Sequence, residues 1–429
     1  MLLFNGMQEE LSGPRSAILK VPFMDSRESF LTRAATWLTF GSAVAIMLSI
    51  AASQILLGLA IAALLLSGEK IKLPRIRLAL GLFLLGTVIS LLASGEIVHG
   101  LPQIRKFFVF TELIVVFSCL REIAIVRWLF LAWAGVGSID ALRGFVQFAA
   151  KMQQAHIPGV SIYQYYVNER ITGFTSHWNT YSAEEMFAFI MICAFLFFSP
   201  AARRRSWVWL LCAALIALAI LLAETRGVYA AVGVATCYLL WFWNRKLVAL
   251  IPVLAVVVFL LSPPVIRERF TSFLEPRQED SNAFRKIVWR SGLRMIEAHP
   301  LLGIGPDGPK YHMLEYLPPD IHQADLPSGF YEHIHNLYLQ YAAERGIPVL
   351  LIFLCMIGQI LVDFFRGARL LPPGRSDKRF LLHGGIAVVL AVLVEGIVEV
   401  NLGDSEVLTM FLVVVACGYL ALEKDLAME

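Results

Sequence analysis

The strongest constraint on this chain is a series of apolar runs, each long enough to cross a hydrocarbon layer of about 30 Å, that recur from one end to the other. The short stretches between them hold most of the charged residues. Apolar residues make up 58% of the chain and charged residues only 16%, with a mean hydropathy of +0.68, outside the usual range of soluble domains. Runs such as 247–261 are apolar on every side, whereas barrel strands would alternate. Because backbone groups in lipid must be satisfied internally, the sequence predicts an all-α, polytopic membrane protein.

The runs predict about twelve transmembrane helices in a single integral membrane domain, residues 1–429. The expected spans are 34–50, 52–67, 78–94, 103–119, 126–148, 181–199, 206–223, 227–243, 247–262, 336–364, 380–401 and 405–422. A tight turn over 51–54 would join the first two spans, and a long loop, 263–334, would separate the ninth from the tenth. The N-terminal 30 residues are not expected to be a cleaved signal, because acidic residues precede the first apolar run.

Basic residues predict the orientation, since short loops rich in Lys and Arg stay in the cytoplasm. Loops of this kind include 70–77, 121–127, 203–205, 245–246 and 366–379. Both termini are therefore expected in the cytoplasm. The loops at 151–180 and 263–334 fall on the opposite side yet carry Arg and Lys of their own, an exception that calls for a function.

Several classes of site are not indicated by the sequence. It contains no CxxC, HExxH or other metal-binding spacing, and no Gly-rich phosphate loop. All six cysteines lie in apolar runs, where they are expected to pack as small apolar groups. A net charge of +3 is too small to predict nucleic-acid binding.

A first candidate site is the arginine in ETRGVYAA, Arg226, which lies between two long apolar spans. A charge in such a place is costly, roughly 2.5 to 3.5 kcal/mol at a helix centre and less near the interface. The alternative is an interfacial arginine whose side chain reaches the lipid headgroups, with Glu224 available to neutralise it.

A second candidate site is the amphipathic helix predicted near 282–298 within the long loop. Lys286, Arg290 and Arg294 recur at four-residue intervals and form a basic stripe. Arg285 projects about 100° away from this stripe and is therefore aimed separately. The alternative is a helix that lies on the membrane surface and attracts anions without specificity.

A third candidate site opens the tenth span, where His335 and Asn336 follow the long loop. Histidine is suited to accept a proton near neutral pH. Alone it would more often be a hydrogen-bonded interfacial residue, but here it accompanies several arginines. A base combined with guanidinium groups suits group transfer from a pyrophosphate donor, because arginine neutralises the leaving diphosphate while the base deprotonates an acceptor hydroxyl.

These residues resemble the O-antigen ligase and Wzy-type polymerase superfamily of bacterial membrane glycosyltransferases. His335, Asn336, nine intervening residues and Gly346 match the ligase motif of His, then Asn, Ser or Gln, then nine residues, then Gly. This motif carries most of the resemblance.

Three further segments are similar to segments of the same family, so the resemblance extends over most of the chain. The stretch from Arg285 to HPLLGIG is similar to an arginine segment, and TRG at 225–227 resembles an arginine at the outer end of a span. RITGFTSHWNTYS at 170–182 resembles a third segment, in which Trp178-Asn179 stands where the family usually has Pro-Asn.

The resemblance implies a GT-C-like helical enzyme of the bacterial inner membrane. It would transfer a glycan from undecaprenyl pyrophosphate to lipid A-core oligosaccharide at the periplasmic face, among membrane lipids and without metal, nucleotide or other cofactor. By match to the motifs, His335 would be the catalytic base, and Arg226 and Arg285 would hold the donor pyrophosphate. Direct displacement by the activated hydroxyl predicts inversion at the anomeric carbon.

Five more residues are substrate-binding candidates. Arg290 follows from the helix register, and Asn336 and Arg170 belong to the family-like segments. Arg105 and Lys106 lie at the outer end of the fourth span, where the distribution of charges disfavours cations.

Three alternatives to a ligase remain. A Wzy-type polymerase uses the same donor but extends another lipid-linked glycan. A transporter or lipid flippase also has many spans, but the halves of the chain show no internal repeat, and no charged residue is expected deep within paired spans. A scaffold for surface partners would not need arginines at the membrane.

Overall fold

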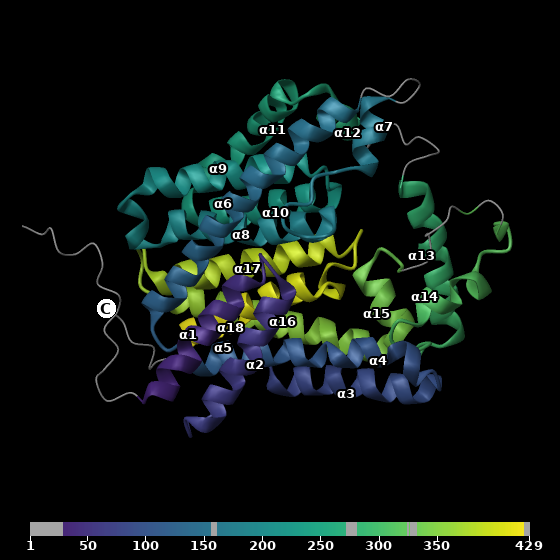
Figure 1. The fold of residues 1–429 in the computed structure, drawn as a ribbon, viewed down its shortest axis with the longest axis horizontal. Helices are drawn as coiled ribbons and strands as arrows, with labels where there is room; N and C mark the ends of the chain where they lie inside the picture. The colour runs from purple at the N-terminus through teal and green to yellow at the C-terminus, as the bar shows by residue number, and fades with distance from the viewer. Residues whose placement is uncertain (1–28, 156–160, 272–280, 324–325, 327–332, 424–429) are drawn as a thin grey trace, which may run out of the picture.

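The computed structural model describes the chain except for residues 1–28, 156–160, 272–280, 324–325, 327–332 and 424–429 (Figure 1). Every regular element among the described residues is a helix. This confirms an all-α membrane protein.

The helices follow one another along nearly the whole described chain. Those in the first half are α1 (Phe30–Ala45), α2 (Ile50–Leu66), α3 (Arg77–Ser94), α4 (Ile97–Arg105), α5 (Phe107–Cys119), α6 (Ile123–Gln154), α7 (Ile162–Asn168), α8 (Trp178–Phe198), η1 (Pro200–Arg203) and α9 (Ser206–Leu222). Those in the second half are α10 (Arg226–Asn244), η2 (Arg245–Ala249), α11 (Leu250–Leu261), α12 (Pro264–Thr271), α13 (Ser281–Ala298), α14 (Gly308–His312), η3 (Met313–Tyr316), α15 (Leu337–Arg345), α16 (Ile347–Leu370), α17 (Asp377–Glu395), η5 (Asn401–Gly403) and α18 (Ser405–Leu422).

Six helical stretches in the described chain are long and apolar enough to cross a membrane. They are α3, α6, α8, the continuous stretch Arg226–Leu261, α16 and α18. Two shorter apolar helices, α2 and α9, accompany them. The multi-pass character is thus established, and the number twelve stays a prediction.

The core of the bundle is built around α8, α17 and α18, which lie at its centre in Figure 1. α17 packs against α8, α10, α16 and α18. Helices that are apolar all round are stable only inside a bundle or in lipid, and α8 and α18 are mostly buried. Outer helices instead expose large apolar side chains, such as Leu78 and Leu85 on α3 and Val253 on α11, as expected for surfaces that face lipid.

Acidic side chains are buried within several helices of the described part of this bundle, contrary to the expectation that no charged residue lies deep within paired spans. Glu112 lies on α5, Asp140 on α6, and Glu184 and Glu185 on α8. Glu112 accepts a hydrogen bond from Ser42 at 3.0 Å. The sequence argument against a transporter therefore rests only on the missing internal repeat.

The turn between the first two helices lies earlier than predicted. Residues 51–54, expected to form it, belong to α2, and the helix starts after Ser49. The Ser49 hydroxyl accepts a hydrogen bond from the backbone N–H of Ala52, which is the usual N-cap interaction. The N-cap at Ser49 therefore determines where α2 begins, and the polar residues at 51–54, which had suggested a turn, lie within the helix.

The predicted tenth span, 336–364, is divided into α15 and α16 at Gly346. This glycine has φ 83° and ψ 163°, a conformation open almost only to glycine. A Cβ there would lie 2.1 Å from the carbonyl oxygen of Leu301. The backbone of Ile347 donates to the carbonyl of Pro300 at 2.8 Å, so the 300–305 segment docks onto the break. Gly346, the glycine of the ligase-like motif, thus allows the backbone of residues 300–305 to pack closely against the break between α15 and α16.

Two other predicted spans also differ from the helices observed. The span 103–119 is divided at Lys106 between α4 and α5, and the span 380–401 ends at Glu395, where α17 stops. Residues 396–400 consequently form a connection outside the helices, and this connection reaches the site described below.

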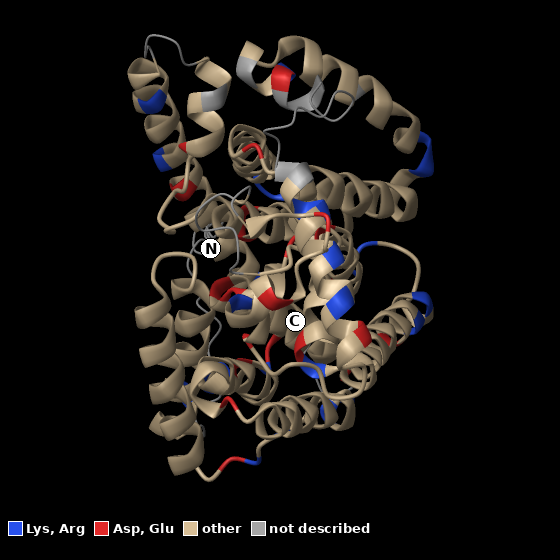
Figure 2. Cartoon of the chain, turned by 90° about the vertical axis from the view of Figure 1, so that its right-hand side faces the viewer, with Lys and Arg blue, Asp and Glu red and all other residues tan. Residues whose placement is uncertain are grey.

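α13 occupies the segment predicted to form an amphipathic helix, and it packs on α15 and η3. A small separate core joins these elements: Val288, Met295, Met313, Ile334 and Ala343. We call α13, α14, η3 and α15 the site lobe. Figure 2 looks onto the end of the molecule that carries it and shows acidic and basic residues gathered near the middle of that end.

Candidate active site at the lobe–bundle junction

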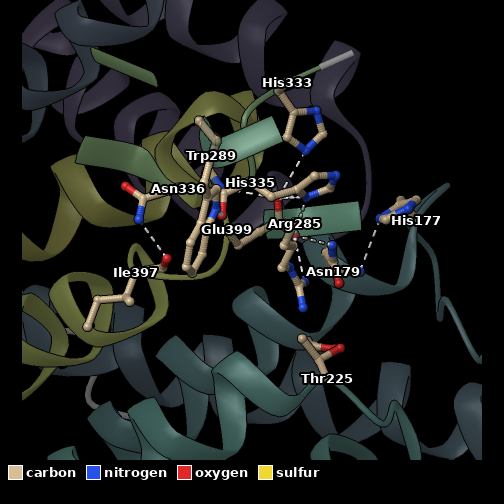
Figure 3. A network of polar contacts seen from close by, with 12 residues as sticks. His177, Asn179, Thr225, Arg285, Trp289, His333, His335, Asn336, Ile397 and Glu399 are labelled. Carbon is tan, nitrogen blue, oxygen red and sulfur yellow. Dashed lines mark hydrogen bonds and ion pairs between the residues drawn. The ribbon is translucent and has the colours of Figure 1, made fainter. Parts of the chain in front are cut away.

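His335 is held in a tight turn immediately before α15. Its φ is 53°, a left-handed value that is uncommon for a residue with a side chain. Asn336 caps the helix by accepting from the backbone N–H of Leu339 at 2.9 Å, and its amide donates to the Ile397 carbonyl at 2.8 Å. The indole Nε1 of Trp289 donates to the His335 carbonyl at 3.2 Å (Figure 3). The histidine is therefore fixed from both α13 and the 396–400 connection.

Glu399, in that connection, is the centre of the polar network in Figure 3. Its carboxylate lies 3.1 Å from His335 Nδ1 and 3.0 Å from His333 Nε2. Asn179, on the first turn of α8, donates to the same carboxylate at 2.9 Å. We call His333, His335 and Glu399 the His–Glu cluster.

The cluster determines which nitrogen of His335 can act as a base. Burial by itself would raise the pKa of Glu399, but hydrogen bonds from His333 and His335 hold this pKa well below its ordinary value. An ionised carboxylate only accepts hydrogen bonds, so Nδ1 of His335 carries a proton. Nε2 of a neutral His335 is then left to accept one.

A cavity of about 160 Å³ lies beside His335 and is rich in arginine. We call it the arginine pocket. Its lining comprises Arg170, His177, Trp178, Asn179, Thr225, Arg226, Gly227, Arg285, His335, Glu395, Val398 and Glu399. Three guanidinium groups predicted from separate segments of the sequence therefore meet in one place.

Arg226 reaches the pocket as the first residue of α10, and its side chain is buried. A Cβ on the next residue, Gly227, would lie 2.7 Å from Val398, so this glycine lets the start of α10 approach the 396–400 connection. The N-terminus of a helix carries partial positive charge and free N–H groups. α10 thus adds to the attraction for an anion in the pocket.

The other two arginines enter from different elements. Arg285, on α13, lies 3.8 Å from Glu399 and retains 21% of its side-chain exposure. Arg170 stacks on the Trp178 ring at 4.6 Å, and its Nε donates to the Val167 carbonyl at 2.8 Å. Both guanidinium groups are oriented by protein contacts before any ligand binds.

The remaining predicted residues lie outside the arginine pocket. Arg290 forms a bidentate pair with Asp320 on the surface, at 2.8 and 2.6 Å. Arg105 is exposed, whereas its neighbour Lys106 donates to the Gly403 carbonyl at 2.6 Å and lines a second cavity. The amide of Asn336 is engaged in the cap described above.

Among the residues that the structure describes, the His–Glu cluster is also a group that could hold a metal ion by its geometry, since its ligand atoms lie within 4.8 Å of one another. Two imidazoles and a carboxylate are suitable ligands for a transition metal. The same atoms already satisfy one another through hydrogen bonds. Independence from metal stays a prediction with a direct test.

Glu399 and His177 were not predicted from the sequence. Glu399 was assigned to the interior of the span 380–401, although the pair of glutamates in EGIVEV was a sign that the span ends earlier. His177 caps α8, and its Nδ1 accepts from the backbone N–H of Asn179 at 3.2 Å. Burial lowers the pKa of His177, which favours the neutral imidazole that can accept this bond.

Comparison with known protein families identifies a family that part of this chain resembles. Residues 211–354 match the family model described as O-Antigen ligase (Wzy_C). The matched segment includes Arg226, Arg285 and His335 and ends before Glu399. No curated protein gives a significant match to the chain.

Proposed function

We propose that the chain, whose residues 211–354 match the O-antigen ligase family model, belongs to the O-antigen ligase and Wzy polymerase superfamily and is an inner-membrane glycosyltransferase acting at the periplasmic face. It transfers O-antigen polysaccharide from undecaprenyl pyrophosphate to lipid A-core oligosaccharide. In this topology both chain termini are cytoplasmic. The enzyme needs no metal or nucleotide in this mechanism.

The observation that carries the proposal is the meeting of three guanidinium groups and an imidazole in one cavity of about 160 Å³. The donor's diphosphate binds between Arg226 and Arg285, with Arg170 as a third cation. Charge-assisted bonds from arginine to phosphate oxygens are about twice as strong as neutral ones. As the bond from the anomeric carbon to the diphosphate breaks, its electron pair moves to the leaving oxygen, and the arginines stabilise the added charge.

His335 supplies the base in the same step. Nε2 takes the proton from the acceptor hydroxyl as its oxygen forms the new bond to the anomeric carbon. Glu399 positions the ring through Nδ1 and stabilises the imidazolium that results, at an N–O distance of 3.1 Å. A single displacement of this kind inverts the anomeric configuration.

A reconstituted transfer assay tests the proposal. The full chain in liposomes is given undecaprenyl-pyrophosphate-linked glycan and lipid A-core, and the ligated product is quantified. We expect His335→Ala to abolish transfer while donor binding is retained, and Arg226→Ala or Arg285→Ala to weaken donor binding.

Lys286→Met is the matched control for Arg285, because Lys286 is the adjacent, exposed cation on α13. It should leave transfer and donor binding unchanged. If the His335→Ala variant transferred glycan at the wild-type rate, His335 would not be the catalytic base.

A deletion strain distinguishes a ligase from a polymerase. If the chain is a ligase, its loss leaves polymerised glycan on the lipid carrier. If it is a polymerase, its loss leaves glycan of a single repeat unit, and lipid A-core would not be its acceptor.

A further inference from the structure

A second, larger cavity adjoins the His–Glu cluster, with His333 and Glu399 in its lining. Its volume is about 510 Å³, within the range of roughly 300 to 1,000 Å³ typical of small-molecule sites. His177, Asn179 and Glu399 line both this cavity and the arginine pocket. The two cavities are thus neighbours that share one wall.

The two cavities differ in charge. Around the arginine pocket, three arginines outnumber two glutamates, Glu395 and Glu399. Around the second cavity, five carboxylates outnumber three Lys and Arg side chains. The carboxylates are Asp307, Glu344, Glu399, Asp404 and Glu406, and the cations are Lys106, Lys310 and Arg345. This excess of negative charge disfavours a diphosphate, whereas mixed carboxylate, amide and ammonium groups suit the hydroxyls of a saccharide.

Several of these polar groups are already held in position. The Gln103 amide donates to Asp307 at 2.6 Å, and the Thr180 hydroxyl donates to Asp404 at 2.7 Å. Lys106 is anchored on the Gly403 carbonyl at 2.6 Å. A lining whose side chains are oriented in advance loses less conformational freedom when a ligand binds.

The direction of the displacement selects which saccharide binds there. With the diphosphate on the arginine side, an in-line attack requires the acceptor hydroxyl to arrive from the opposite side. His333 lines the second cavity and His335 the arginine pocket, with ring centroids 4.0 Å apart. A hydroxyl entering from the second cavity therefore passes His333, whose ring lies beside that of the base.

We propose that the second cavity is the binding site for the acceptor saccharide, with Lys106, Gln103 and Asp307 among its contacts. The assignment rests on the proposed glycosyl transfer. It also explains why Lys106, predicted to bind substrate, lies away from the arginines.

Binding and transfer are measured separately to test this proposal. Binding uses delipidated lipid A-core oligosaccharide with the detergent-solubilised full chain and no donor. We expect Lys106→Met and Gln103→Ala each to weaken binding and to raise the acceptor KM at least tenfold, with the donor KM within twofold of wild type. Lys106→Arg, which keeps the charge, should recover most of the affinity.

Two controls separate the cavities. Glu297→Gln changes an exposed carboxylate that lines neither cavity and should alter nothing. Arg226→Ala should raise the donor KM and leave oligosaccharide binding intact.

Unchanged oligosaccharide binding in both Lys106→Met and Gln103→Ala would overturn the acceptor assignment, as would a rise in the donor KM alone. Failure of the proposed function looks different: wild type would bind the oligosaccharide, and Lys106→Met would weaken that binding, yet no glycan would be transferred.

Discussion

Replacement of Glu399 by Gln is the most informative single change, because it keeps the shape of the side chain and removes its charge. The carboxylate faces His335 Nδ1 at 3.1 and 3.2 Å and His333 Nε2 at 3.0 Å. With its oxygen in the Oε1 position, a glutamine could still accept from both histidines, but its NH2 group would replace Oε2 and oppose the Asn179 amide, which donates to Oε2 at 2.9 Å. During transfer the imidazolium of His335 would lose its counter-charge.

The size of the effect follows from the geometry. Opposite unit charges 3.1 Å apart interact by roughly 5 kcal/mol at an effective dielectric constant of about 20. Because the side chain of His335 is 33% exposed, solvent screens part of this energy, and we take about half. A loss of about 2.5 kcal/mol in the transition state corresponds to a fall in kcat of roughly 70-fold.

The assay is steady-state transfer in proteoliposomes, with kcat and donor KM determined separately. We expect kcat to fall roughly 70-fold in Glu399→Gln while the donor KM stays within about twofold. Glu399→Asp, which restores the charge, should recover part of the loss. Glu169→Gln, at an exposed carboxylate outside both cavities, is the matched control.

A double mutant tests whether Glu399 acts through His335. Added to His335→Ala, Glu399→Gln should cause little further loss, because residues that act as a unit are not additive. The positioning role would be refuted if the two substitutions reduced kcat independently, so that their losses multiplied in the double mutant. A Glu399→Gln variant with wild-type kcat would refute it as well.

Three further perturbations have defined outcomes. Gly346→Ala should destabilise the fold by about 2 to 4 kcal/mol, because its Cβ would meet the Leu301 carbonyl at 2.1 Å. Gly358→Ala is the control, since a Cβ there meets nothing within 4 Å. Equal melting temperatures of the two variants would contradict this prediction. EDTA should leave the transfer rate unchanged, and a loss restored by a divalent metal would reassign the His–Glu cluster as a metal site. A hydrogen bond to Glu96 raises the pKa of His312, so the stabilisation it gives is complete below about pH 6.5 and is lost as pH rises through the raised pKa. The protection factors of the α14 amides, which are corrected for the intrinsic pH dependence of exchange, should therefore fall as the pH rises through that pKa, and the fall should be smaller in Glu96→Gln, where Glu315 remains a partner of His312.

The sequence was sufficient for features encoded locally. Long apolar runs predict buried or lipid-facing helices wherever they occur, because no other structure satisfies the backbone in lipid. Arg226, Arg285 and His335 could be singled out because each is a polar group in an apolar or amphipathic setting. That they line one cavity was expected from the chemistry of the proposed reaction, and the structure brings them together there.

Contacts between side chains that are distant in the sequence could not be predicted from local sequence patterns. Helix register put Arg290 on a definite face but could not indicate that Asp320, thirty residues later, pairs with it. Glu399 lies 64 residues from His335 and becomes its partner only because α17 ends at Glu395. Hydropathy extended that helix through the connection, since Ile397 and Val398 are as apolar as the span itself.

The small core of the site lobe has a mechanical consequence. Val288 on α13 and Ile334 beside the histidine belong to that core, so Arg285 and His335 are carried on one body. Arg226 and Glu399 come from the bundle, whose core also includes Leu337 and Tyr341 of α15. The seam between lobe and bundle is closed by contacts such as the backbone bond from Leu337 to Gly396 at 2.8 Å. Because Arg285 comes from α13 while Arg226 and Glu399 come from the bundle, the position of α13 on this seam sets the distances from Arg285 to both of them together.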